Sequence, residues 1–159
     1  MISLAEATDL LTREALYLDR REWYAWLALY IDDAVYWAPA WRDEITPTSD
    51  PDTELSLIYY HGKHNLEDRV WRVQSGLSVA SSPIPRTVHQ VTNVFVGDDG
   101  TVHAAWAVHQ FNARRQTQHS FFGSYEYQLV HDGGGWKIAM KKIILLNDRI
   151  PTVADFYSL

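Results

Sequence analysis

The sequence predicts an α+β fold in which N-terminal helices pack on a curved antiparallel sheet. Apolar residues recur at helical spacing in the N-terminal part of the chain, and from residue 86 onward they recur at every second position. Helical segments followed by a long run of strands are typical of an α+β fold, because a parallel sheet would show βαβ alternation. The length of 159 residues, without a repeat or linker, predicts a single domain over residues 1–159.

Two helices are expected at the N-terminus. Ser3 and Glu6 have the spacing of a capping box, in which a hydroxyl and a carboxylate satisfy the first amides of a helix. Apolar residues then follow on one helical face over residues 4–19, namely Leu4, Ala7, Leu11, Ala15 and Leu18. The polar run at 19–22 would start a second helix, which carries Trp23, Trp26, Leu27 and Tyr30.

The next segment is expected to hold β-structure around a loop. The run AVYWAPAW (34–41) is rich in strand-forming residues and is interrupted by Pro39. Residues 42–54 are polar and rich in turn formers, which predicts a loop. The run LSLIYYHG (55–62) then returns to apolar and aromatic residues.

A third helix is expected over residues 66–75. Asn65 can cap its start, and Gly76 suits its exit. Its apolar face would carry Leu66, Val70 and Val73, followed by Leu77. A loop through SSPIP (81–85) leads to the strands.

Four strand-like runs follow, at residues 87–96, 101–112, 119–131 and 135–146. The segments GDDG (97–100) and DGGG (132–135) are typical of tight hairpins, so the runs form an antiparallel meander. A curved sheet wrapped around a helical hairpin makes a cone, the NTF2-like (cystatin-like) architecture.

The composition excludes several classes of protein. A net charge of −6 does not attract nucleic acid, and the absence of Cys excludes disulfides, thiolate catalysis and Cys-ligated iron–sulfur clusters. The N-terminus lacks the pattern of a signal peptide and no apolar run reaches a membrane span, so a cytoplasmic protein without membrane contact is expected.

Seven Trp and nine Tyr exceed what one small core readily hides, which favours a ligand pocket or a protein interface.

One set of residues could carry acid–base chemistry. Asp33, His89 and His109 would converge inside a cone if both histidines faced inward. A histidine that titrates near neutral pH and is oriented by a carboxylate can act as a general base. This set resembles the Asp/His/His arrangement of scytalone dehydratase-like proteins. The alternative is that both histidines are hydrogen-bonded strand residues without a chemical role.

Other chemistry has little support in the sequence. His61 and His64 flank a short Gly-Lys pair, which is a weak metal-binding pattern, and neither an HExxH motif nor a GxSxG motif occurs. No metal or cofactor is therefore expected in this chain.

Two segments favour contacts with other chains. ARRQTQHSFFGSYEYQLV (113–130) places large side chains on both faces of a strand, which favours an oligomer. DPDTELSLIYYHGKHNLEDRVWR (50–72) combines Arg with aromatic residues, the types enriched at interface hot spots, although a solvated helix face is equally compatible. The interface candidates are Tyr59, Tyr60, Arg69, Trp71, Arg72, Arg86 and His89.

Several ordered motifs resemble the small (β) subunit of aromatic-ring-hydroxylating dioxygenases, in the branch that acts on benzoate, toluate and anthranilate. The resemblance covers nearly the whole chain and rests on DPDTELSLIYYHG (50–62), LEDRVWR (66–72), SPIPRTVHQVTNV (82–94) and KKIILLND (141–148).

This resemblance implies an NTF2-like chain without a cofactor that packs with a larger α subunit in an α3β3 hexamer. The α subunit of such an enzyme holds a Rieske [2Fe–2S] cluster and a mononuclear Fe(II), and NADH supplies electrons through a reductase, in some systems with a ferredoxin. Both atoms of O2 are added to a benzoate-like ring. Arg86 and His89 would then belong to a structural polar network near an interface or the mouth of the cone.

Two other functions stay open at this point. One is a stand-alone NTF2-like dehydratase or isomerase that uses Asp33, His89 and His109. The other is a module that binds a small ligand in an aromatic cone without chemistry.

Overall fold

A computed structural model describes residues 1–77, 83–150 and 154–159. The elements in chain order are α1 (Leu4–Arg20), α2 (Trp23–Leu27), β1 (Tyr30–Pro39), β2 (Ser56–His61), α3 (Lys63–Gln74), β3 (Arg86–Val96), β4 (Val102–Asn112), β5 (Thr117–His131), β6 (Trp136–Leu145) and the short 3₁₀ helix η2 (Phe156–Ser158). The α+β order is the predicted one, and each of the four C-terminal strands lies within two residues of its expected bounds.

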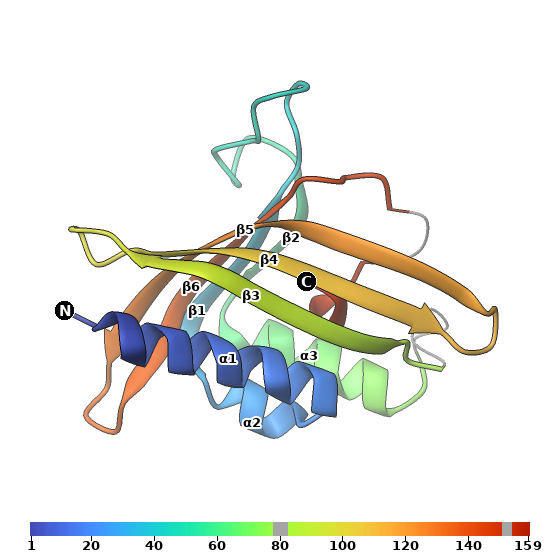
Figure 1. Cartoon of the computed structure of the whole chain (residues 1–159), viewed down its shortest axis with the longest axis horizontal. Coiled ribbons are helices and arrows are strands. Elements are labelled where there is room, and N and C mark those ends of the chain that lie inside the picture. Colours follow the sequence, from blue (N-terminus) through green and yellow to red (C-terminus); the bar gives the residue numbers. More distant parts are fainter. Residues whose placement is uncertain (78–82, 151–153) are drawn as a thin grey trace.

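The strands form one curved sheet in the order β2-β1-β6-β5-β4-β3. The three helices cover one face of this sheet, and the opposite face carries no helix in the described part of the chain (Figure 1). The meander from β3 to β6 is antiparallel as predicted. The sheet is nevertheless mixed, because β1 pairs with β6 in parallel, which corrects the expectation of a purely antiparallel sheet.

The ends of the helices follow the local chemistry. Ser3 and Glu6 form the predicted capping box at the start of α1. Asn65 does not cap α3, because the helix already begins at Lys63 with Gly62 at the cap position, and the Asn65 side chain donates to the His61 carbonyl instead. Gly76 has a left-handed φ of +72° directly after α3, as its predicted place at the exit requires.

The second helix is shorter than its pattern suggested. It ends at Leu27, and Tyr30 opens β1, which begins four residues before the predicted strand. Of the predicted loop at 81–85, residues 81 and 82 lie outside the described residues. Residues 42–54 form the predicted loop between β1 and β2, with one isolated bridge between Trp41 and Pro47.

Aromatic rings fill the space between the helices and the sheet. Trp26 is fully buried and contacts the rings of Tyr30, Tyr36 and Phe156 at centroid distances of 5.0 to 6.3 Å. Phe156 and the two residues that follow it are almost completely buried, so η2 closes one side of the core. The chain therefore hides more of its aromatic surface than the composition indicated.

A buried ion pair crosses this aromatic core. The Lys141 ammonium on β6 lies 3.0 Å from the Glu14 carboxylate on α1, and both side chains are at most 3% exposed. The hydroxyls of Tyr30 and Tyr127 donate to the two oxygens of the same carboxylate at 2.5 and 2.7 Å. Glu14 thus connects α1 to strands β1, β5 and β6.

Glu14 stays ionised in this environment. Burial alone would raise the pKa of its carboxyl, but the Lys141 charge and the hydrogen bonds from the two tyrosines outweigh burial and hold the pKa below its usual value.

We predict that Glu14→Gln lowers the free energy of unfolding by about 3–5 kcal/mol, because it leaves the Lys141 ammonium buried without its counter-ion. Urea unfolding at neutral pH measures this loss. The control is Asp9→Asn, which removes an exposed ion pair with Arg13 on the same helix and is expected to cost at most about 0.5 kcal/mol. Equal losses in the two variants would contradict the role given to Glu14.

The lowered pKa of Glu14 also predicts a pH dependence. Near pH 4.5, the usual pKa of a Glu, the unfolded chain takes up a proton that the folded chain does not, so stability falls as the pH drops below this value through the folded pKa. Unfolding curves from pH 7 downward should show a steeper loss in the parent chain than in Glu14→Gln. Parallel pH profiles would contradict the assignment.

Candidate functional site

The three residues that could have formed a catalytic set do not converge. Asp33 lies at a bulge of β1, where its side chain is 85% exposed and contacts His61 at 2.9 Å. His89 is directly paired with Val108, whereas His109 is directly paired with Val88. Directly paired residues share a face of the sheet and neighbours along a strand alternate, so the two histidines point to opposite faces. The condition that both histidines face inward is therefore not met, and the alternative set of Asp33, His89 and His109 does not come together.

His89 instead forms a buried pair with Asp19, at the C-terminal end of α1. Its Nδ1 lies 2.5 Å from Asp19 Oδ1, and its backbone N–H donates to the other carboxylate oxygen at 2.9 Å. The Thr87 hydroxyl donates to the same carboxylate at 3.0 Å. Burial opposes ionisation of Asp19, but the hydrogen bonds from His89 and Thr87 hold its pKa below the usual value.

This Asp–His pair has the form of a catalytic dyad and helps to line a surface pocket of about 460 Å³, but the free ring nitrogen is not exposed to that pocket. The His89 side chain is 2% exposed, and its Nε2 is buried without a hydrogen-bond partner among the described residues. A general base must reach the proton that it abstracts, directly or through a water molecule. The pair therefore acts as a brace that fixes the end of α1 to the start of β3.

Metal binding has no support in the described residues. They contain no group of three or more His, Asp or Glu placed to hold an ion. His61 is engaged with Asp33, and the His64 ring packs against Gly62. A Rieske cluster needs two Cys ligands, and the chain has no Cys, so its residues do not fit that group.

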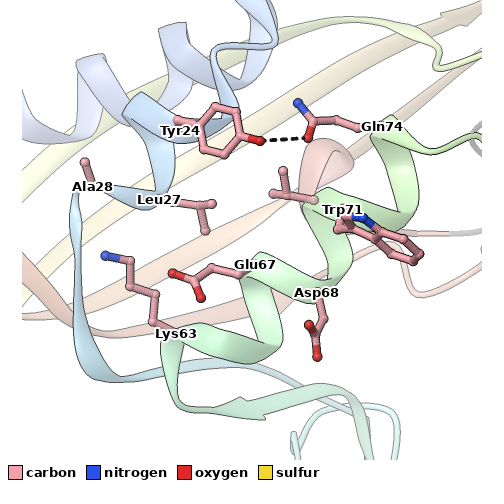
Figure 2. A pocket seen from close by; sticks show the side chains of 9 residues that line it. Tyr24, Leu27, Ala28, Lys63, Glu67, Asp68, Trp71 and Gln74 are labelled. Atoms are coloured by element: carbon pink, nitrogen blue, oxygen red, sulfur yellow. Dashed lines mark hydrogen bonds between the residues drawn. The ribbon is translucent and has the colours of Figure 1, made fainter.

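A groove between α2 and α3 is the clearest candidate for a binding surface (Figure 2). Its volume is about 500 Å³. We define the α2–α3 groove by its lining residues, which are Tyr24, Leu27, Ala28, Lys63, Glu67, Asp68, Val70, Trp71 and Gln74. Tyr24 is 73% exposed and Trp71 is 60% exposed, and the Tyr24 hydroxyl donates to Gln74 at 3.3 Å. Two large exposed aromatics beside a charged rim are typical of a protein interface.

The other predicted interface residues are spread over the surface. Tyr59 lies on the sheet face opposite the helices, where its ring contacts Trp37, whereas Tyr60 is half-buried on the other side of β2.

Among the predicted arginines, Arg69 is paired within the chain with Asp155. Arg86 is exposed and lies over the Phe111 ring at 5.9 Å.

Part of the groove could be predicted from the sequence, because Trp71 was among the predicted interface residues. Tyr24 and Gln74 were not among them. Tyr24 lies between Trp23 and Trp26, both of which are buried, so it occupies the outward face of α2. A tyrosine on the helical face opposite two buried tryptophans was the pattern that could have identified it.

We predict that Asp19→Asn lowers the free energy of unfolding by about 1–3 kcal/mol, the range for a buried group that loses its partner. The matched control is Asp33→Asn, which weakens an exposed Asp–His pair and should change stability by at most about 0.5 kcal/mol. Chemical denaturation of both variants measures the difference. A neutral Asp19→Asn variant would contradict the role of the pair as a brace.

Comparison with known proteins gives a consistent result. Residues 13–152 match the family model described as "Ring hydroxylating beta subunit". Toluate 1,2-dioxygenase subunit beta from Pseudomonas putida is 39% identical over 158 residues, which cover 98% of each chain.

Solved structures agree with this match. The beta subunit of the benzoate 1,2-dioxygenase from Burkholderia mallei superposes with a TM-score of 0.80 at 35% identity, over 100% of this chain and 99% of that chain. An NTF2-like protein with a cystatin-like fold from Novosphingobium aromaticivorans matches with a TM-score of 0.60 at 15% identity, over 91% and 82% of the two chains. The predicted NTF2-like fold is confirmed.

Proposed function

The chain belongs to the ring hydroxylating beta subunit family, and from this premise we propose that it is the non-catalytic, structural subunit of a dioxygenase that acts on a benzoate-like aromatic acid. The chain is a subunit of an oxidoreductase, as its relatives are. A cytoplasmic location is part of this proposal. No described helix is long and apolar enough to cross a membrane.

The observation that carries the proposal is the occupied interior of the cone. Glu14, Lys141, Tyr30 and Tyr127 satisfy one another, and fully buried aromatic rings surround them. These four side chains are bonded to one another, so none of the four is free to act on a substrate. The Rieske cluster and the mononuclear Fe(II) would be held by the larger α subunit, with electrons from NADH delivered through a reductase and, in some systems, a ferredoxin.

The assembly would be an α3β3 hexamer in which the β chains form a trimer. We propose that the α2–α3 groove is a contact with the α subunit, because its two exposed aromatics and charged rim have the composition of an interface centre. Arg72 and Tyr59 are accessible for further contacts. Arg69 and His89 would act indirectly, by holding α3 and β3 in place.

The alternative of a stand-alone dehydratase or isomerase is not supported. The family match points to a dioxygenase subunit, and Asp33, His89 and His109 lie apart.

Coexpression with a large subunit of the same dioxygenase class from the same organism tests the proposal. We expect a complex with the mass of three copies of each chain by light scattering and the visible absorption of a Rieske cluster, whereas this chain alone is colourless. A chain that stays separate from the large subunit, and that carries dehydratase or isomerase activity alone, would overturn the proposal.

We predict that Trp71→Ala weakens binding to the α subunit by about 2 kcal/mol or more, roughly thirtyfold in Kd, because an exposed Trp in a groove has the properties of a hot spot. The isolated chain should lose little stability, because the indole is 60% exposed. Titration with purified α subunit measures the effect. Leu4→Ala, an exposed apolar residue on α1, is the control. Unchanged affinity in Trp71→Ala would exclude the groove as the contact.

A further inference from the structure

The loop between β1 and β2 stands away from the body of the molecule (Figure 1). We call residues 41–55 the arm. It carries five carboxylates and one guanidinium, from Asp43, Glu44, Asp50, Asp52, Glu54 and Arg42. Two apolar side chains on it are almost fully solvated, because Ile45 is 86% exposed and Leu55 is 80% exposed. Exposed apolar residues on an acidic projection indicate a surface that another molecule covers.

The arm is held in one conformation by its own side chains. Asp43 accepts hydrogen bonds from the backbone N–H groups of Ile45 and Thr46 at 2.9 and 2.8 Å. Glu54 accepts from the backbone N–H groups of Ser49 and Asp50 and from Arg42, and these bonds lower its pKa to about 2. A preorganised projection loses little conformational entropy when it binds.

A basic and apolar pocket lies at the other edge of the sheet. It has a volume of about 300 Å³ and is lined by Arg86, Thr87, Val88, His109, Gln110, Phe111 and Gln118. Val88 is 49% exposed within it, and Arg86 lies over the Phe111 ring. We call this the β3–β4 pocket.

The strands that carry this pocket are depleted in negative charge around it. The sequence has no Asp or Glu from Arg69 to Gly97 or from Gly100 to Tyr125, whereas Arg114 and Arg115 lie in the β4–β5 turn. The carboxylate that does approach β3, Asp19, is occupied by Thr87 and His89. The arm is acidic and exposes apolar side chains, and the pocket is basic and contains the apolar residues Val88 and Phe111. The two surfaces are therefore complementary in charge and in polarity.

The topology separates the two surfaces within one chain. The arm joins β1 and β2 at one edge of the sheet, and β3 forms the opposite edge. The base of the arm is anchored to β6, because Trp41 Nε1 donates to the Leu145 carbonyl at 2.8 Å. Two different complementary surfaces on one chain produce a head-to-tail contact, which closes into a ring when the rotation permits.

We propose that the arm of one copy of this chain docks in the β3–β4 pocket of a second copy. Ile45 covers the apolar surface around Val88 and Phe111, while Asp43 and Glu44 face Arg86 and the arginines of the β4–β5 turn. The contact repeats around a ring, and in this respect it rests on the proposed function, which requires a trimer of this chain.

Cysteine cross-linking tests this contact, and links between copies of this chain can form only at the introduced residues because the chain has no Cys. One sample of the full chain carries Ile45→Cys and a second carries Val88→Cys. They are mixed, coassembled with the large subunit and treated with a short bismaleimide. We expect cross-links between the two variants and none within either variant alone. A chain that carries both substitutions should give linked species up to the size of the ring. In the control, Ile45→Cys is mixed with Tyr24→Cys, which lies on an exposed residue of the α2–α3 groove. This mixture should give no cross-links between the two variants.

Charge reversal gives a second, independent measurement. Arg86→Glu should weaken self-association by at least about tenfold, and the addition of Asp43→Arg and Glu44→Arg to the same chain should restore it at every contact of the ring. The proposal is overturned if Ile45→Cys links only to itself or to the large subunit, or if charge reversal leaves self-association unchanged. The proposed function fails separately, when the chain does not copurify with the large subunit at all.

Discussion

The buried ion pair between Glu14 and Lys141 is the constraint on which the rest of the structure depends. Transfer of two charges into an apolar interior is costly, and their attraction repays this cost only when the remaining hydrogen-bonding positions are filled. Tyr30 and Tyr127 fill them, so the pair is satisfied only when α1, β1, β5 and β6 are all in place. We infer that this cluster selects one packing of the helix on the sheet.

The same geometry places large side chains at the centre of the cone. The centre of the cone is taken by the ion pair, its two tyrosines and the rings of Trp26 and Tyr36. At the end of α1, the Asp19 carboxylate is likewise occupied by hydrogen bonds with Thr87 and His89. The surfaces that carry the proposals lie on the outside, in the α2–α3 groove, on the arm and in the β3–β4 pocket. Such a distribution suits a chain that assembles with others and leaves the chemistry to its partner.

Much of the fold could be predicted because its patterns are local. Period-two runs separated by GDDG and DGGG located the meander, and the capping box located α1. The parallel pairing of β1 with β6 has no local sequence pattern, since it depends on how the chain returns after α2. Asn65 failed as a cap because a glycine three residues earlier provided the turn.

The site was harder to predict, for physical reasons. The sheet face of a histidine depends on strand register, and the placement of His89 and His109 on opposite faces follows from pairings that one sequence does not reveal. The buried ion pair between Glu14 and Lys141, in contrast, has a recognisable sequence pattern. Glu14 continues the apolar stripe of Ala7, Leu11 and Leu18, and Lys141 shares its strand face with Ile143 and Leu145. A charged residue on each of two apolar faces indicates a partner inside the core.

The central claim is that this chain supports assembly and performs no chemistry. The most direct measurement is turnover per Rieske cluster in complexes that contain His89→Ala in place of the parent chain. The account predicts a lower yield or stability of the complex, with unchanged turnover in the fraction that assembles. Normal assembly and stability combined with turnover that falls by orders of magnitude would contradict it.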